Sequence, residues 1–297
     1  MNYLLLALIP AAFGLNPVIG RALHTSFEPA TLTVLRWLFS AVIIGTIALS
    51  RGRRERWHAS LADYAILLCL AALGMGFCSY AAYAGAQTAT ATTVGLFYAC
   101  TGAIVAGYEI ARGVTRASLS LILGLALCLG GVATLLTRGH LETIAQLQIG
   151  DGELWALAGT IGWAAYSIAM RPRANILTPL ASFTVMSIAA TAATLPFMAL
   201  ELQAPHPLPP FEASHAAWIA ALVLITGVAA FIGYNWSLAR NGAILTSAAI
   251  SLSPVYIAGM AIVLIGEQVA WYHGAALALV TSGLVAINCA RATPSAR

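Results

Sequence analysis

The chain has 297 residues, of which 60% are hydrophobic and only 8% are charged, whereas a typical soluble domain is about 25% charged. Its 14 basic and 10 acidic residues cannot cover the surface of a 30.9 kDa globule, which excludes an ordinary water-soluble protein, and the high hydrophobicity excludes disorder. The net charge of +4 gives no indication of a nucleic-acid partner. The apolar runs are continuous rather than alternating, so we expect an all-α integral membrane protein in the lipid bilayer and not a barrel.

Polar breaks divide the N-terminal half into five predicted spans, because each crossing of a bilayer needs about 20 apolar residues. Residues 1–50 split into two spans at the segment HTSFEP, where Pro29 suits a helix start. The first span lacks a basic leading region, so we interpret it as retained and not as a signal peptide. Residues 61–111 are long enough for two spans, with the turn expected at residues 85–87, and residues 119–137 form the fifth.

The C-terminal half divides in the same way. Residues 153–170 and 179–201 form one span each. Residues 215–290 hold only two charged residues and fit three spans, which we expect to break at residues 240–242 (RNG) and 267–273. The predicted total is ten transmembrane helices.

The arginines test this count, since every basic residue is an arginine and cytoplasmic loops carry an excess of positive charge. With the N-terminus in the cytoplasm, only Arg21 and Arg138 lie outside, and Arg36 lies within the second span. The other eleven fall on the cytoplasmic side: Arg51, Arg53, Arg54, Arg56, Arg112, Arg116, Arg171, Arg173, Arg240, Arg291 and Arg297. We therefore expect a multi-pass protein of the cell (inner) membrane with both termini in the cytoplasm.

The two halves resemble each other weakly. The matches are residues 13–16 followed by Arg21 with 163–166 followed by Arg171, Pro29 with Pro179, Tyr80 with Tyr234, and Glu109 with Glu267. Because five is odd, the second half must enter the membrane from the opposite side, which makes an inverted repeat. We expect a first repeat at 1–137, an extracytoplasmic connecting loop at 138–152, a second repeat at 153–290 and a cytoplasmic tail at 291–297. A substrate site is then expected near the midplane, between the halves.

Several stretches resemble the drug/metabolite transporter superfamily, EamA type. Residues 13–16 (FGLN) are similar to its WG-x-N start, and residues 35–37 (LRW) to its alanine-arginine-aromatic stretch. The strongest match is residues 252–256 (LSPVY) continuing through 265–267 (IGE) to the spaced Gly274 and Gly283. The first repeat departs from the pattern, with Leu96 where the family often has proline and Tyr108-Glu109 in place of Gly-Glu. The resemblance implies a basket-like helical carrier that exports small metabolites, often amino acids.

Polar and aromatic residues within spans are the candidate substrate contacts, because lipid penalises polar groups there. Tyrosine and tryptophan offer a flat apolar body with one polar handle, which suits an amphiphilic substrate in a cavity. The alternative is the interfacial belt or ordinary helix packing. The candidate cavity residues are Asn16, Tyr80, Tyr83, Tyr98, Trp163, Tyr166, Asn235, Trp236, Ser251 and Tyr256.

Three charged residues are candidates for a gate or an ion pair. Arg36 lies several residues inside the outer end of its span and needs protein or water around it. Glu267 has a comparable outer depth, so a pairing with Arg36 is geometrically possible, and Glu109 closes the fourth span near the opposite face. The alternatives for Arg36 are a structural ion pair, snorkelling to the membrane interface, an extracellular gate and a group that binds a carboxylate.

The predicted function is secondary transport of small metabolites, exported by alternating access. No acid lies at mid-span, so we expect facilitated or weakly coupled transport. The rivals are an efflux carrier for cationic aromatic compounds and, in a different class, a channel or a structural membrane protein. An enzyme is not expected, because there is no HExxH, P-loop or GxSxG motif, and we expect no cofactor, no metal and a monomer.

Overall fold

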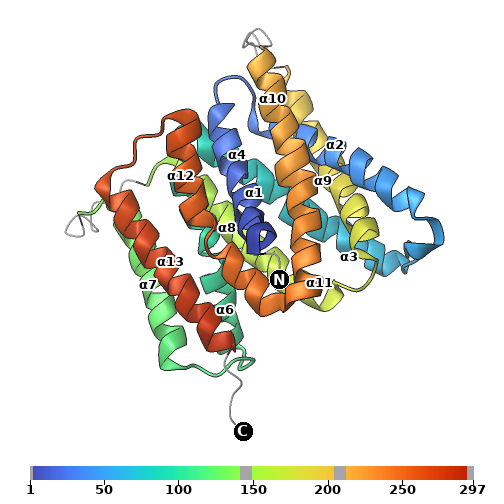
Figure 1. Cartoon of the computed structure of the whole chain (residues 1–297). Coiled ribbons are helices and arrows are strands. Elements are labelled where there is room, and N and C mark those ends of the chain that lie inside the picture. The colour runs from blue at the N-terminus through green and yellow to red at the C-terminus, as the bar shows by residue number, and fades with distance from the viewer. Residues whose placement is uncertain (1–2, 141–148, 204–211, 293–297) are drawn as a thin grey trace.

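The computed structural model describes residues 3–140, 149–203 and 212–292, and all regular secondary structure in this part of the chain is helical, with no strand. Most of the predicted loop at 138–152 and of the predicted tail at 291–297 lies outside the described residues. The α-helices are α1 Tyr3–Ala22, α2 Pro29–Ser50, α3 Leu61–Ala71, α4 Cys78–Thr88, α5 Ala91–Ala99, α6 Thr101–Ala111, α7 Leu119–Leu136, α8 Asp151–Met170, α9 Pro179–Glu201, α10 Ala213–Ala221, α11 Ala230–Ile250, α12 Ser253–Ile265 and α13 Trp271–Ala292 (Figure 1). Two π-helical segments, η2 Ala72–Phe77 and η5 Leu222–Ala229, join α3 to α4 and α10 to α11.

Seven helical stretches of the described chain are long and apolar enough to cross a membrane. They are Pro29–Ser50, Leu61–Thr88, Ala91–Ala111, Leu119–Leu136, Pro179–Glu201, Ala213–Gly242 and Trp271–Ala290. The apolar helices at Leu6–Ala22 and Ser253–Ile265 are shorter. The expected number of ten therefore needs α1, α8 and α12 in addition to the seven.

The breaks between helices follow local chemistry. Pro29 occupies the first turn of α2, where its missing N–H costs nothing. Gly242 (φ 78°, ψ 170°) interrupts α11 at the expected RNG break, and Gly266 ends α12 in the left-handed conformation. The turn expected at residues 85–87 is misplaced, because α4 continues to Thr88 and Thr90 caps α5 through its side chain.

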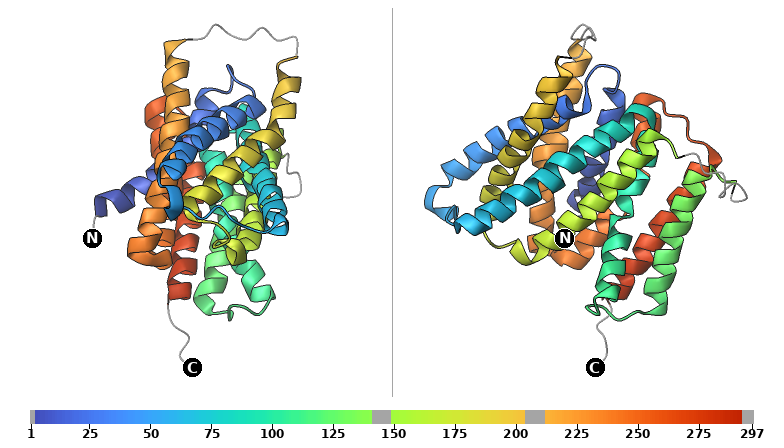
Figure 2. Two further views of the ribbon diagram at one scale, coloured as in Figure 1. Left: turned by 90° about the vertical axis from the view of Figure 1, so that its right-hand side faces the viewer. Right: turned by 180° about the vertical axis from the view of Figure 1, so that it is seen from behind.

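The helices pack in a reciprocal pattern between the two halves of the chain. The most extensive pairings are α7 with α13 and α2 with α9, each joining corresponding helices of the two halves, and α7 and α13 lie side by side in both Figure 1 and Figure 2. The packing of α4 on α8 is matched by that of α11 on α1, and the packing of α9 on η2 by that of α2 on η5. Two similar halves that exchange contacts in this way fit a two-repeat architecture.

The π segments fix the register between the halves. A Cβ added at Gly76 would meet Thr194 and Ala190 of α9, and one added at Gly227 would meet Ser40 of α2. Gly76 and Gly227 therefore occupy corresponding crossings. Tyr83 follows Gly76 by the same number of residues as Tyr234 follows Gly227. Tyr83, and not Tyr80, therefore corresponds to Tyr234 in the other half, which corrects the pairing expected from the sequence.

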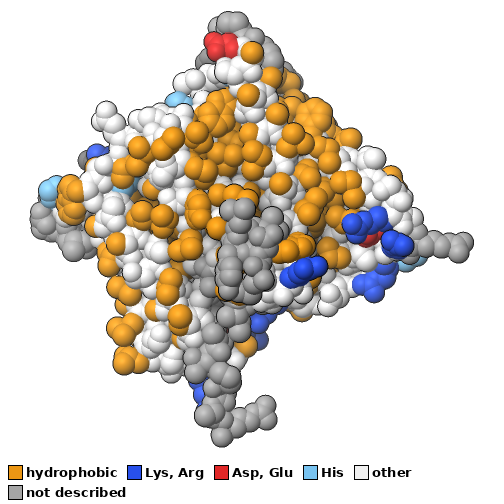
Figure 3. Space-filling model, viewed as in Figure 1, with side chains coloured by type: hydrophobic (Ala, Val, Ile, Leu, Met, Phe, Trp, Pro, Cys, Tyr) orange, Lys and Arg blue, Asp and Glu red, His pale blue; other side chains and the backbone are white. Residues whose placement is uncertain are grey.

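The outer surface is apolar where lipid is expected. Figure 3 shows hydrophobic side chains across most of one face, with the arginines mainly towards one edge. Large side chains such as Leu49 and Val263 are 70% and 80% exposed. A water-soluble chain does not leave such a face open, whereas a lipid-embedded one requires it.

Candidate functional site

A buried polar cluster surrounds Arg36 where α1, α2, α4 and η5 meet. Arg36 is only 7% exposed. Its Nη1 donates to Asn16 Oδ1 at 3.0 Å and to Tyr83 Oη at 3.4 Å. The Tyr83 hydroxyl in turn donates to Asn16 Oδ1 at 2.7 Å, and Tyr83 is fully buried. One amide oxygen thus receives both donors and links α1, α2 and α4.

The fourth member of the cluster is a backbone carbonyl released by the π segment η5. Ala230 N–H donates to Ile225 O, five residues back, so the Thr226 carbonyl is available to another donor. Arg36 Nη2 donates a hydrogen bond to the Thr226 carbonyl oxygen at 3.2 Å. The cluster therefore joins the first half of the chain to the second through an irregular helical turn, and π segments are frequent at functional sites.

The next residue, Trp37, makes the corresponding contact with the other π segment. Its Nε1 donates to Met75 O at 2.7 Å and to Ser79 Oγ at 3.0 Å. The Trp37 ring also lies 4.3 Å from the Arg36 guanidinium carbon, within cation–π range. Adjacent residues of α2 thus hold both irregular turns.

The pairing of Arg36 with Glu267 that their depth made possible does not occur among the described residues. Glu267 instead accepts the backbone N–H groups of Ala91 at 2.8 Å and Thr92 at 3.2 Å, at the N-terminus of α5. A carboxylate there satisfies free helix donors and the helix dipole. Across the described chain, Arg36 has no carboxylate within ion-pair distance, and its partners are two neutral side chains and one carbonyl.

Glu109 lies apart from the other two gate candidates. It is 8% exposed and forms an ion pair with Arg171 at 2.5 Å, with Thr115 donating to it at 3.4 Å. This pair links the end of α6 to the end of α8. The three charged candidates therefore occupy three separate places.

Four of the predicted aromatic residues lie where α4, α5 and α8 meet. Tyr98 donates to Cys78 O at 2.5 Å, and a Cβ added at Gly159 would lie 1.9 Å from its hydroxyl, so α8 approaches closely only through that glycine. The rings of Trp163 and Tyr166 lie 4.9 Å apart, and Tyr80 packs edge-on against a ring of α8, Trp155, at 5.4 Å. These contacts form an aromatic interface between the halves, and none of them is a hydrogen bond to Arg36.

Three other candidates lie on α11 or between α11 and α12. Asn235 donates to Phe231 O at 2.9 Å within its own helix, and Trp236 lies under the Arg240 guanidinium at 5.8 Å. Ser251 accepts from Asn288 of α13 at 2.6 Å. These contacts are local and bring none of the three to the Arg36 cluster.

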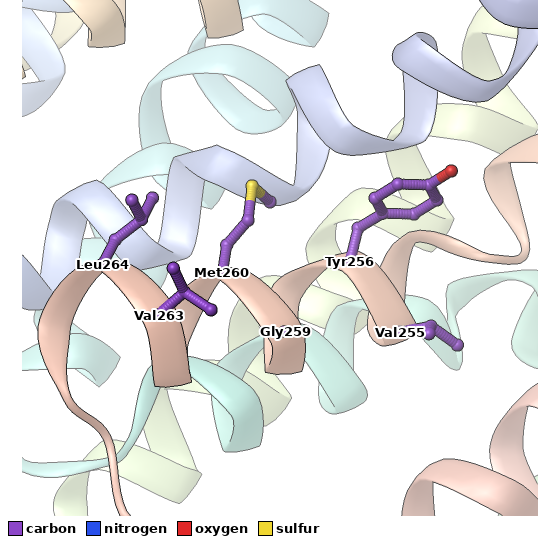
Figure 4. A pocket seen from close by; sticks show the side chains of 6 residues that line it. All are labelled: Val255, Tyr256, Gly259, Met260, Val263 and Leu264. Carbon is purple, nitrogen blue, oxygen red and sulfur yellow. The ribbon is translucent and has the colours of Figure 1, made fainter.

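A shallow apolar groove of about 380 Å³ runs along α12. It is lined by Val255, Tyr256, Gly259, Met260, Val263 and Leu264, and Figure 4 shows Met260 directed towards the neighbouring helix. Tyr256 is the one predicted cavity residue that contributes to it. The groove is too open and apolar to be the expected site between the halves.

Several contributors escaped prediction from the sequence. Thr226 acts through a carbonyl, which no side-chain motif reveals. Glu201 accepts the N–H groups of Ala30 at 2.7 Å and Thr31 at 2.8 Å, at the N-terminus of α2. The sequence did contain a signal for Glu201, because an acid at the end of one span can reach the N-terminus of a helix that begins on the same side of the membrane. In the described residues no group of three histidines, cysteines or acids fits a metal ion.

These features define a class: a multi-pass helical membrane protein built of two similar halves. The model of the EamA-like transporter family matches residues 1–137 and 151–289. The chain belongs to the EamA-like transporter family. This is a family of transporters and not of enzymes.

Two individual proteins are similar to the chain. An uncharacterized transporter, YyaM, of Bacillus subtilis (strain 168) is 30% identical over 134 residues, which is 45% of this chain and 44% of that protein. The match thus spans less than half the length of the curated relative. A solved chain described only as the crystal structure of a protein aligns with a TM-score of 0.61 at 18% identity, covering 95% of this chain and 96% of the other. That likeness extends to the fold alone.

Proposed function

We propose that the protein is a ten-span secondary carrier that exports small metabolites, amino acids or related amphiphilic compounds, by alternating access. Its repeats are taken to divide as 1–137 and 153–290, with both termini on the cytoplasmic side of the inner membrane. The reciprocal packing of the halves carries this proposal. Two similar halves that can exchange their contacts give two related conformations, open to opposite sides.

Contacts at the helix ends join neighbouring helices on the predicted outer side. Glu201 ties α9 to the start of α2, and Glu267 ties α12 to the start of α5. Arg21 Nη1 donates to Ala86 O at 2.9 Å and Gln87 O at 3.0 Å, which joins α1 to α4 at the same end. All these segments lie on the predicted outer side, where the sequence has few arginines.

Contacts at the opposite end join segments that the same distribution assigns to the cytoplasm. Arg56 and Glu55, after α2, bond to Asn175 and Thr178 before α9. Loops that touch must lie on one side of a bilayer, so the contacts support the grouping of the loops. Which of the two groups is cytoplasmic rests on the arginine excess.

Flux measurements on the purified full-length chain in liposomes test the proposal. A carrier gives saturable uptake of a labelled solute that is accelerated when the same unlabelled solute is trapped inside. A channel gives flux that neither saturates nor accelerates, and a structural protein gives none. A pH gradient serves as the second variable, because facilitated transport continues without it and strict dependence on it contradicts weak coupling.

A further inference from the structure

We propose that Arg36 is the group that binds a carboxylate of the transported molecule, an inference that rests on the proposed carrier function. The substrate class is then a small carboxylic acid or a zwitterion with a free carboxylate, and not the cationic aromatic amine that the sequence left open. Three observations carry it: the uncompensated charge of Arg36, an unused donor on its guanidinium and its place between the halves.

The charge of Arg36 lacks a counterion in the described chain. An arginine stays protonated at any accessible pH. Its residue is 7% exposed and its acceptors are Asn16, Tyr83 and the Thr226 carbonyl, all neutral. A buried charge with only neutral partners is costly, and a mobile anion that enters the site offsets that cost. A cation at the same place adds repulsion.

The guanidinium also has a donor to spare. Arg36 Nε is buried and has no hydrogen-bond partner in the structure. A carboxylate accepts two parallel N–H groups from one guanidinium, which is the geometry that makes this pair specific. A carboxylate at the Nε edge of Arg36 would satisfy the unused donor and supply the missing charge with one group.

The position of Arg36 links such binding to transport. Its side chain contacts α1 and α4 of the first half and η5 of the second. A carboxylate that competes for these N–H groups weakens the hold of Arg36 on Asn16 or on Thr226, and so loosens contacts between spans that must separate. The apolar neighbour of the guanidinium is the Trp37 ring, which lies 4.3 Å from the guanidinium carbon.

Matched pairs of acids and amides provide the test. The probes are the proteinogenic L-amino acids and simple aromatic and aliphatic monocarboxylates, each beside its carboxamide, and binding is measured by the thermal stability of the purified full-length protein. At least one acid is expected to stabilise the protein saturably, with its amide at least about tenfold weaker. Stabilisation by amides equal to that by acids, or by no acid in the set, overturns the inference.

The variant Asn16→Asp separates a binding role of Arg36 from a structural one. It places a carboxylate of the same shape 3.0 Å from Arg36 Nη1, so the charge is compensated and the fold is retained. The expected result is at least about tenfold weaker binding of the acid, because the new side chain competes with it. Unchanged binding in Asn16→Asp overturns the inference, since a purely structural arginine predicts that result.

Two further variants control for the loss of an arginine. Arg36→Gln is expected to abolish the preference for acid over amide. Arg21→Gln removes another arginine that bonds only to carbonyls, at the outer helix ends, and is expected to leave the preference intact. In liposomes, saturable flux of amines without flux of acids contradicts the assignment of Arg36 alone. Absence of saturable flux for any solute contradicts the carrier function itself.

Discussion

The closest approach of a glycine in one half to the backbone of the other half gives the sharpest prediction of stability. A Cβ added at Gly283 of α13 would lie 2.6 Å from Gly124 O and 3.0 Å from Cys128 N, both backbone atoms of α7. Ordinary contact begins at about 3.4 Å, so Gly283→Ala requires the helices to separate by about 0.8 Å. Backbone cannot rotate away as a side chain can, so the substitution strains the whole α7–α13 pair.

The expected cost of Gly283→Ala is about 1–3 kcal/mol, the range for overpacking a well-packed interface. Each kcal/mol lowers the unfolding temperature by roughly 2–4 °C in a chain of this size. Thermal unfolding of the purified protein in detergent measures it. Gly274→Ala on the same helix and Gly130→Ala on α7 are the controls, because an added Cβ there meets nothing within 4 Å.

The controls also remove the effect of helix propensity, since all three substitutions exchange glycine for alanine within a helix. None of the candidate site residues lies on α7 or α13, so binding by folded Gly283→Ala is expected to be unchanged. Equal unfolding temperatures for Gly283→Ala and Gly274→Ala would refute the close approach of the two backbones. They would also remove the reason to treat this pair as a fixed scaffold.

Three further predictions concern the ends and crossings of spans. Glu201→Gln removes the charge from the α2 N-terminus and is expected to cost about 0.5–2 kcal/mol, whereas Glu28→Gln, at an exposed acid with no side-chain cap bond, costs nothing measurable by thermal unfolding. Gly227→Ala clashes with Ser40 Oγ at 2.2 Å, so it is expected to lower stability and Ser40→Ala to restore it, which a double-mutant cycle of unfolding temperatures checks. Burial lowers the pKa of His24, in the turn after α1, below its ordinary value of 6.5. As the pH falls below about 6.5 the unfolded chain therefore binds a proton at His24 before the folded chain does, so the folded state loses stability between pH 7 and pH 5. His24→Gln is expected to reduce this loss in unfolding curves measured across that pH range. A pH dependence identical to that of the unaltered protein contradicts the prediction.

The sequence predicted the helix breaks well because each break has a local cause. Pro29 starts a helix whatever surrounds it, and Gly266 adopts a left-handed conformation that other residues avoid. The grouping of the loops stays a prediction from the arginines, whose distribution follows the side of the membrane and not the tertiary fold. The turn after α4 was misplaced by a few residues because Gly85 is used for close packing against Gly152 O and not for turning.

The partners of Arg36 could not be predicted in the same way. Depth along a span is one coordinate, and it made Glu267 a plausible partner. Contact also requires the rotation of each helix and the order of its neighbours, which the chain sets through long-range packing. Tyr80 and Tyr83 illustrate the point, because three residues rotate a side chain by about 60°. That angle is enough to send Tyr83 to Arg36 and Tyr80 to Trp155.

The irregular turn η5 explains how the Arg36 charge can be buried. In the interior of a regular α-helix each carbonyl already accepts the N–H of the residue four positions later, so it is less available to a buried arginine. The extra residue in η5 frees the Thr226 carbonyl, and Arg36 uses it from the other half of the chain. A carbonyl neutralises no charge, however, and Asn16 and Tyr83 do not either. Among the described residues, the arrangement that lets Arg36 be buried therefore leaves its charge without a counterion, a property that favours an anionic ligand and that a permanent structural ion pair would remove.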